Sequence, residues 1–222
     1  MIVRLGMAPR NDGTSFEQFQ EHWRTSHADV VSTMPGLRGY VQLHAVLEGG
    51  VPVLPYPGFD ACSALSFDDV AGMDAAFDSP TFRQDVQQDE KAFVDKTRFT
   101  CVIGDWRSAL ASVDALGPVV LAVLWRCGPG LAPGALADVL AERLDGTAHG
   151  LLVADHDAHE GRFPVAADVV EMTGHATVAE AAAAAGAAAP VEGASRTAHH
   201  LATTVVVVGD DHPAPTHERT TR

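Results

Sequence analysis

Cysteine is scarce in this sequence, and its three residues, Cys62, Cys101 and Cys127, lie far apart along the 222-residue chain. No two of them have the CxxC spacing of a zinc knuckle, and an odd number of widely spaced thiols does not suggest a disulfide framework. We therefore interpret the cysteines as small buried hydrophobic side chains, of which only Cys62 falls on a strand of interest for function.

Positive charge is also in short supply. The chain carries 15 lysine and arginine residues against 29 aspartate and glutamate residues, for a formal net charge of −14. Such a chain repels a phosphate backbone, so we expect no nucleic-acid partner. No apolar run approaches the ~20 residues of a membrane span, and Arg4 interrupts the apolar start that a signal peptide would need. We expect a cytoplasmic protein with no membrane partner.

The motifs of several large enzyme classes are missing. The sequence has no GxSxG, no P-loop and no GxGxxG between a strand and a helix, which argues against serine hydrolases and nucleotide-dependent enzymes. His156, His159 and the pair His199 and His200 do not have the spacing of a known metal site. We expect neither a metal nor a cofactor.

The most informative stretch is 15–34, which predicts one amphipathic helix with Ser15 and Gln18 forming a capping box. At about 100° per residue, His27 falls within ~20° of the centre of the apolar stripe, whereas His22 falls about 120° away. We expect His27 to point inward and His22 to face solvent. A buried histidine needs a hydrogen-bond partner and has a tunable pKa, although an ordinary core histidine would give the same pattern. The stripe consists of Phe16, Phe19, Trp23, Val30 and Met34.

Residues 39–48 alternate between two kinds of side chain and predict a strand with two different faces. One face is apolar and is expected to join the core. The other carries polar groups, and it either lines a pocket or is exposed to solvent. The apolar face holds Val41, Leu43, Ala45 and Leu47, and the polar face holds Tyr40, Gln42, His44 and Val46.

A long loop and a second polar strand follow. The loop 48–59 contains Tyr56, is rich in glycine and proline and is too long for a tight hairpin, which is typical of a lid. The next strand, 60–67, begins with the carboxylate of Asp60. The helical pattern of 68–95 is broken near Pro80.

The order of predicted elements is β-α-β-β-α-β in the first half and recurs in the second half. First-half strands are predicted at 1–7, 39–48, 60–67 and 98–104, with helices at 15–34 and 68–95. Second-half strands are predicted at 118–126, 150–157, 167–174 and 203–209, with helices at 132–144 and 177–189. The predicted fold class is α+β, with a ferredoxin-like unit at 1–105, a connector at 106–117, a second ferredoxin-like unit at 118–210 and a disordered tail at 211–222.

The two halves differ at one position of interest. When the apolar stripes of the two equivalent helices are superposed, His27 aligns with Leu144. Because a leucine fills this place in one half, a purely structural role would not require histidine in the other. We therefore expect a polar hollow at His27 and a plugged one at Leu144.

The first half resembles an EthD-type member of the dimeric α+β barrel superfamily, over residues 1–104. The resemblance is carried by the opening strand MIVRLGMAPR, the helix FEQFQEHWRTSHADVV with its W-x3-H signature at Trp23 and His27, and the strands PGLRGYVQLH and FDACSALSFD. It implies that two ferredoxin-like sheets close into an eight-stranded barrel with helices outside. Most such proteins are homodimers, so duplication in one chain implies a pseudo-dimer, with a further homodimer as an option.

The superfamily includes cofactor-free cyclases, dehydratases, lactone isomerases and monooxygenases, as well as haem enzymes and proteins without known chemistry, so it constrains the fold better than the reaction. Its pockets typically lie between one sheet and its helices. We expect His27 to act as general acid or base. Tyr40 or His44 would be a second proton carrier, and Asp60 an orienting group. The residues expected to contact the substrate are Trp23, Gln42, Tyr56, Cys62 and Phe67.

The predicted function is that of a cofactor-independent lyase, isomerase or cyclase acting on a small hydrophobic molecule, aromatic or polyketide-derived. One alternative is an accessory barrel that binds a ligand without transforming it. Another is a monooxygenase, either cofactor-free or haem-dependent. In the haem-dependent case His27, His44 or His175 would be the axial ligand.

Overall fold

A computed structural model describes residues 1–187 and 189–209 of the chain. The tail expected at 211–222 lies outside the described residues. Within the described part, no helix is long and apolar enough to cross a bilayer.

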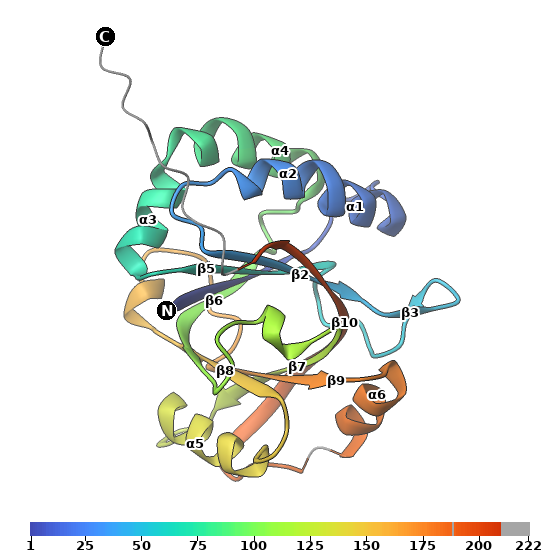
Figure 1. Ribbon diagram of the computed structural model, residues 1–222, viewed down its shortest axis with the longest axis vertical. Helices are drawn as coiled ribbons and strands as arrows, with labels where there is room; N and C mark the ends of the chain where they lie inside the picture. Colours follow the sequence, from blue (N-terminus) through green and yellow to red (C-terminus); the bar gives the residue numbers. More distant parts are fainter. Residues whose placement is uncertain (188, 210–222) are drawn as a thin grey trace.

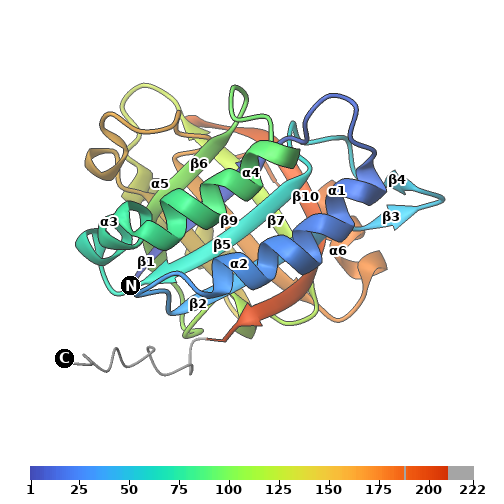
Figure 2. The ribbon, with the colours of Figure 1, turned by 90° about the horizontal axis from the view of Figure 1, so that it is seen from above.

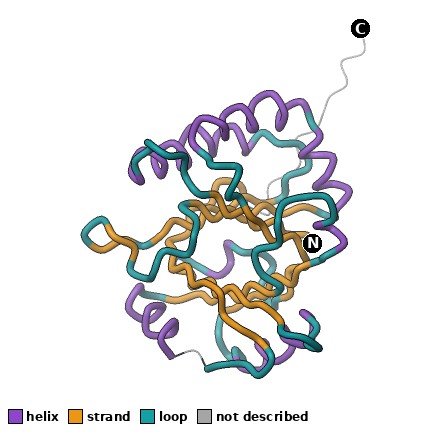
Figure 3. The backbone as a smooth tube through the Cα atoms, turned by 180° about the vertical axis from the view of Figure 1, so that it is seen from behind, coloured by secondary structure: helices purple, strands orange, loops and turns teal. Residues whose placement is uncertain are grey.

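Eight antiparallel strands form a closed barrel at the centre of the molecule (Figure 3). Their order around the barrel is β1-β5-β2-β10-β7-β9-β8-β6, and β6 pairs again with β1. A short hairpin of β3 (Leu47–Glu48) and β4 (Val51–Pro52) projects from one end. The barrel strands are β1 (Ile2–Ala8), β2 (Gly39–Ala45), β5 (Ala61–Phe67), β6 (Thr100–Arg107), β7 (Val119–Cys127), β8 (His149–Ala154), β9 (Val169–His175) and β10 (Ala194–Val208).

The two halves of the chain use the same strand order. The first half contributes β6-β1-β5-β2, and the second contributes β10-β7-β9-β8. The barrel closes where β2 pairs with β10 and β6 pairs with β8. The predicted mixed α+β class with an eight-stranded barrel is therefore confirmed.

Helices cover two opposite outer faces of the barrel (Figure 1). Seen from above, the two helical segments of the first half run side by side across its strands (Figure 2). The second half covers the other face with two shorter helices. The first-half helices are α1 (Phe16–His22), α2 (Ala28–Ser32), α3 (Val70–Asp78) and α4 (Gln87–Phe93), and the second-half helices are α5 (Pro133–Arg143) and α6 (Val178–Ala187).

The apolar side chains form three clusters, because every strand has one face inside the barrel and one under the helices. Val41 and Leu43 belong to the barrel interior, together with residues from all the other strands. Tyr40 points the other way and packs with Trp23 and Phe93 under the first-half helices. The predicted alternation of 39–48 is thus confirmed for β2, and its polar face lies beneath the helix.

The helix predicted at 15–34 forms, but it is not a regular α-helix throughout. Its capping box is present: the Ser15 hydroxyl accepts from the Gln18 amide at 3.2 Å, and the Gln18 side chain accepts from the Ser15 amide at 3.1 Å. Between α1 and α2, however, Trp23–His27 is a π-helical turn, and Phe82–Val86 forms a second one between α3 and α4. Such turns contain an extra residue and often occur at functional sites.

The last strand differs most from its prediction. It was expected at 203–209, but β10 begins at Ala194 and pairs with both β7 and β2. Its first part contains Arg196 and the pair His199 and His200, which hide the strand pattern in the sequence. A change of register between Arg196 and Ala198 further disturbs the alternation.

Candidate functional site

The two histidines of the first helix share one carboxylate. His22 Nε2 lies 2.7 Å from Asp89 Oδ1, and His27 Nδ1 lies 2.7 Å from Asp89 Oδ2. His27 is buried, as predicted, whereas His22 is only partly exposed and is tied to the same group. The expectation that His22 faces solvent is therefore wrong in part, because the π-helical turn brings it towards the side of His27.

Asp89, on α4, was not identified from the sequence. Burial alone would raise the pKa of Asp89, but the hydrogen bonds from His27 and His22 outweigh it and hold the pKa below its ordinary value. Asp89 is therefore a carboxylate at neutral pH. It can fix the orientation of the His27 ring through the hydrogen bond to Nδ1.

His27 lines a small crevice between the helices and the sheet. The crevice has a volume of about 40 Å³ and is also lined by Tyr40, Trp23 and Arg4. That volume suffices for about one water molecule. The ring of His27 thus has a polar partner and a void beside it.

A larger cleft of about 780 Å³ adjoins the crevice and shares four lining residues with it. It lies between the α3–α4 segment and the loop that contains Gly161 and Phe163. Its volume is in the range of small-molecule sites. The shared residues are Arg4, Phe77, Phe82 and Glu90.

A chain of hydrogen bonds runs under the first helix from Tyr40 to Asp60. Gln42 Nε2 donates to the Tyr40 hydroxyl at 2.8 Å, and Gln42 Oε1 lies 2.9 Å from His44 Nε2. His44 Nδ1 lies 2.6 Å from Gln20 Oε1, and Gln20 Nε2 donates to the Asp60 carbonyl at 2.7 Å. Four predicted site residues, Tyr40, Gln42, His44 and Asp60, are therefore linked, although they do not meet at one point.

Both glutamines present an oxygen to the ring of His44. Gln42 Nε2 also donates to the Trp23 carbonyl, and Gln20 Nε2 donates to the Asp60 carbonyl. Because a carbonyl can only accept, the Oε1 atom of each glutamine faces the ring. That arrangement requires a proton on each ring nitrogen. Burial, with Arg24 and His200 nearby, instead lowers the pKa of His44 to about 3.

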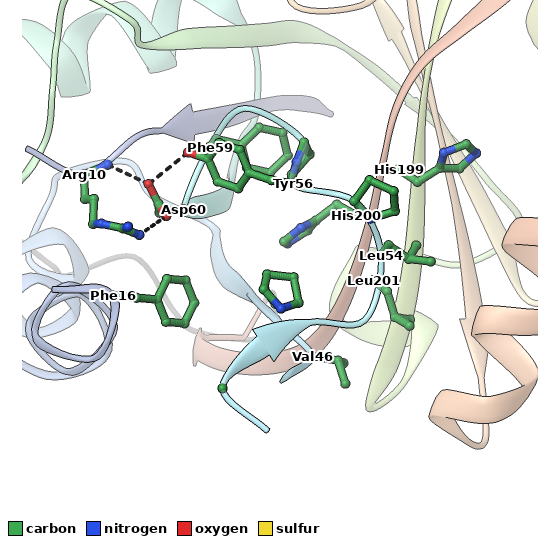
Figure 4. A pocket seen from close by; sticks show the side chains of 15 residues that line it. Arg10, Phe16, Val46, Leu54, Tyr56, Phe59, Asp60, His199, His200 and Leu201 are labelled. Atoms are coloured by element: carbon green, nitrogen blue, oxygen red, sulfur yellow. Dashed lines mark hydrogen bonds and ion pairs between the residues drawn. The ribbon is translucent and has the colours of Figure 1, made fainter. Parts of the chain in front are cut away.

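Asp60 lies in a different place from the one predicted. Its carboxylate pairs with the Arg10 guanidinium at 2.6 Å and accepts from the Tyr56 hydroxyl at 3.1 Å (Figure 4). It does not orient His27, because its charge is directed to Arg10. The carboxylate that contacts His27 is that of Asp89, on α4.

Tyr56 and Asp60 line a pocket of about 290 Å³ where the predicted lid loop meets β10 (Figure 4). Phe59 and His200 also line it, with ring centroids 5.1 Å apart. The Nε2 of His200 lies 2.9 Å from the Leu43 carbonyl, and burial lowers the pKa of His200. His200 is therefore a neutral ring that donates to the backbone.

Cys62 and Phe67, which were expected to contact the substrate, lie apart from these cavities. Cys62 is in the barrel interior, where burial raises the pKa of its thiol to about 12. Phe67 packs under the helices against Phe77, with ring centroids 6.1 Å apart. Both side chains therefore pack in the hydrophobic core and do not line these cavities.

The second half is not plugged at the equivalent place, so that expectation is wrong. A cavity of about 600 Å³ lies between its sheet and helices, and Leu144 is only one part of its wall. Glu171 lines the cavity and accepts from Trp125 Nε1 at 2.9 Å. Because α5 ends at Arg143, the helix covers less of its sheet than 16–32 does in the first half.

The histidines of the first half do not fit a haem. His27 Nδ1 is bound to Asp89 and its crevice is far smaller than a cofactor pocket. Both ring nitrogens of His44 are bound to glutamines. His175 lines the second-half cavity, with its Nε2 2.9 Å from the Thr173 hydroxyl. Among residues 1–187 and 189–209, no three His, Cys, Asp or Glu side chains gather in a metal-binding group.

Residues 11–97 match the family model of the EthD domain. An EthD family protein from Bacillus halodurans C-125 is 21% identical, with a TM-score of 0.38, over 47% of this chain and 98% of its own. An anthrone oxidase-like protein is 8% identical, with a TM-score of 0.58, over 96% of each chain. A provisionally assigned monooxygenase from Lactobacillus acidophilus NCFM is 10% identical, with a TM-score of 0.51, over 93% of this chain and 94% of its own.

No curated protein sequence matches the chain. The two longer structural matches share the fold over nearly the whole of both chains. The family match covers the strands and helices that hold His27, Tyr40 and Asp89. The first half of this chain therefore matches the EthD domain over residues 11–97, and the whole chain shares the barrel fold of the two longer structural matches.

Proposed function

We propose that the EthD half is a cofactor-independent acid–base enzyme, a lyase, isomerase or cyclase, for a small aromatic or polyketide-derived molecule. The observation that carries this proposal is the 2.7 Å contact between His27 Nδ1 and Asp89 at the wall of the crevice. The carboxylate favours the tautomer with the proton on Nδ1. That leaves Nε2, which has no hydrogen-bond partner among the described residues, as the base.

Tyr40 supplies a second group for the reaction. Its hydroxyl accepts a hydrogen bond from Gln42, so its own proton is free to be donated. Burial raises the pKa of Tyr40 to about 12, which keeps that proton in place at neutral pH. Tyr40 can therefore polarise a carbonyl while His27 removes a proton from the adjacent carbon.

The crevice admits only a substituent, so the body of the substrate would occupy the adjoining cleft of about 780 Å³. Acid–base help from a positioned side chain accelerates a reaction about 10²–10⁴-fold. Such a gain suits substrates whose protons are already activated by neighbouring carbonyl groups.

The test is deuterium exchange into the activated methylene of an aromatic β-diketone, 1-phenylbutane-1,3-dione, followed by NMR in D2O. We expect His27→Gln to lower the exchange rate by a factor of at least about 10², and Asp89→Asn to lower it by a smaller factor. His149→Gln, in the second half, is the matched control. Circular dichroism and Tm identify variants that fail to fold. An unchanged rate in His27→Gln would contradict the proposal.

The wild type and the same variants also distinguish two alternative functions from the proposed one. An accessory binding barrel would bind the diketone without accelerating its exchange. A cofactor-free monooxygenase begins with the same proton removal and then consumes dioxygen. With anthrone as the probe, it would convert anthrone and O2 to anthraquinone and water, which an oxygen electrode detects.

We also propose that the chain is a pseudo-dimer of two fused ferredoxin-like units, 1–105 and 118–210, joined by 106–117. The shared strand order of the halves supports it. Only the first unit has the histidine and carboxylate pair of His27 and Asp89. A further homodimer is tested by light scattering during size-exclusion chromatography.

A further inference from the structure

We propose that the cleft beside His27 binds aromatic carboxylates, and that Arg4 is the residue that anchors the carboxylate. This inference deepens the proposed function and rests on it in one respect: the cleft is taken as the place where the body of the substrate lies. Arg4 is in β1, which forms part of the floor beneath the first-half helices.

Arg4 is an unpaired charge in a nearly closed setting. The residue is only 9% exposed and lines both the crevice and the cleft. No carboxylate of the described residues lies within ion-pair distance of it. A buried charge without a partner is costly to the fold. A ligand that supplies the missing negative charge would remove that cost.

Aromatic rings surround the guanidinium. Its central carbon lies 4.5 Å from the ring centroid of Phe77, 5.2 Å from that of Phe99 and 5.9 Å from that of Phe163. Contacts of this kind stabilise a cation only in part. They also hold the guanidinium plane, and a held plane presents its N–H groups in the geometry that matches a carboxylate.

Gly6, two residues along the same strand, leaves room for this arrangement. A Cβ atom at Gly6 would lie 3.3 Å from an Arg4 side-chain nitrogen and 3.2 Å from the Phe99 ring. Both distances are tighter than ordinary contacts. The absence of a side chain at Gly6 therefore permits the position of the Arg4 guanidinium.

Two other positively charged residues of the cleft are paired with carboxylates, and a third, Lys91, is exposed to solvent. Lys96 pairs with Glu90 at 2.5 Å, and Arg162 pairs with Asp74 at 2.6 Å. Arg4 is thus the buried cation of the cleft that has no carboxylate partner among the described residues, in a protein whose formal net charge is −14. The net negative charge of the chain repels polyanions in general, so an anion binds at Arg4 only if it also makes specific contacts in the cleft.

The walls of the cleft select the rest of the ligand. Phe77, Phe82 and Phe163 line it, and its volume of about 780 Å³ suits a molecule of one or two rings. Edge-to-face and offset contacts with these rings favour an aromatic body. An aromatic carboxylate uses both features, whereas inorganic phosphate uses only the charge.

The experiment measures binding of 1-naphthoate to the whole chain by isothermal titration calorimetry, beside uncharged 1-naphthamide and inorganic phosphate. We expect naphthoate to bind most tightly. We expect Arg4→Met to weaken naphthoate about 10- to 100-fold, to leave naphthamide unchanged and to raise Tm, since the unpaired charge is gone. Arg38→Met, which removes an exposed arginine paired with Asp68, is the matched control and should bind naphthoate normally.

Gly6→Ala provides a second variant that keeps the charge but disturbs its position. We expect it to weaken naphthoate and spare naphthamide. Equal naphthoate affinity in the wild type and Arg4→Met would overturn the proposal, as would tighter binding of naphthamide or of phosphate. His27→Gln separates the two ideas: naphthoate should still bind to it, so loss of exchange and loss of binding are independent outcomes.

Discussion

His22 and His27 bind the two oxygens of one carboxylate, each at 2.7 Å. In an α-helix, residues five apart point about 140° away from each other. The π-helical turn Trp23–His27 contains an extra residue and turns both rings towards α4. The backbone irregularity is therefore what brings both histidines to Asp89.

Replacing Asp89 with asparagine is expected to lower the free energy of unfolding by about 1–3 kcal/mol at neutral pH, because two histidine contacts lose their ionised partner. The folded-state pKa of Asp89 is below its ordinary value. Its contribution is thus present above about pH 4 and is lost as the pH falls through the folded value. Urea unfolding at several pH values measures this. A difference that stays constant down to low pH would contradict it.

His44 is expected to make the fold sensitive to acid. Its pKa is about 3 in the folded protein and about 6.5 when unfolded. The unfolded state therefore takes up a proton first, and stability falls from about pH 6.5 downwards by up to about 1.4 kcal/mol per pH unit. His44→Gln should flatten this slope relative to the wild type. An imidazolium NMR signal from His44 at pH 7 would contradict the prediction and would show that both glutamine oxygens face the ring.

Glu171 is expected to behave in the opposite way. Burial raises the pKa of this carboxyl despite the hydrogen bond from Trp125. Its ionisation therefore costs stability as the pH rises above the unfolded value near ~4.3. Glu171→Gln keeps an acceptor for Trp125 and removes the charge. We expect a higher Tm than wild type at pH 8 and a similar Tm at pH 4. A lower Tm at pH 8 would show that the ionised form is needed.

The cysteines should differ in reactivity. Cys62 is buried with a pKa of about 12, whereas Cys127 is half-buried. The thiolate is the reactive form. Titration of the native protein with a disulfide reagent at pH 8 should modify Cys127 first and leave Cys62 intact, and Cys127→Ala should remove the early phase. Early modification of Cys62 would contradict the prediction and would show that the reagent reaches the barrel interior.

The sequence was informative wherever a side chain's position depended on its near neighbours. The alternation of 39–48 correctly placed Tyr40 and Leu43 on opposite faces, because a strand has a fixed period of two. The helix at 15–34 was found for the same reason. Its angular detail failed because hydropathy does not reveal a π-helical turn, and His22 was misplaced as a result.

Contacts between distant segments could not be read in this way. Asp89 is one of many acidic residues, and nothing in the spacing of 68–95 marks it as the partner of His27. Asp60 looked equally suitable at the start of its strand, but Arg10 holds it elsewhere. The size of a cavity depends on how whole helices pack on a sheet. The identity of residue 144 as leucine therefore could not predict the second-half cavity that Leu144 and Glu171 line.

The closed strand order also bears on how the chain can be handled. The first half has sheet edges at β2 and β6, and the second has sheet edges at β10 and β8; in the barrel β2 pairs with β10, and β6 pairs with β8. Cutting the chain between its halves would uncover four rows of backbone amide and carbonyl groups, which promote aggregation. Neither half is a ready-made fragment for study, and the protein must be expressed entire.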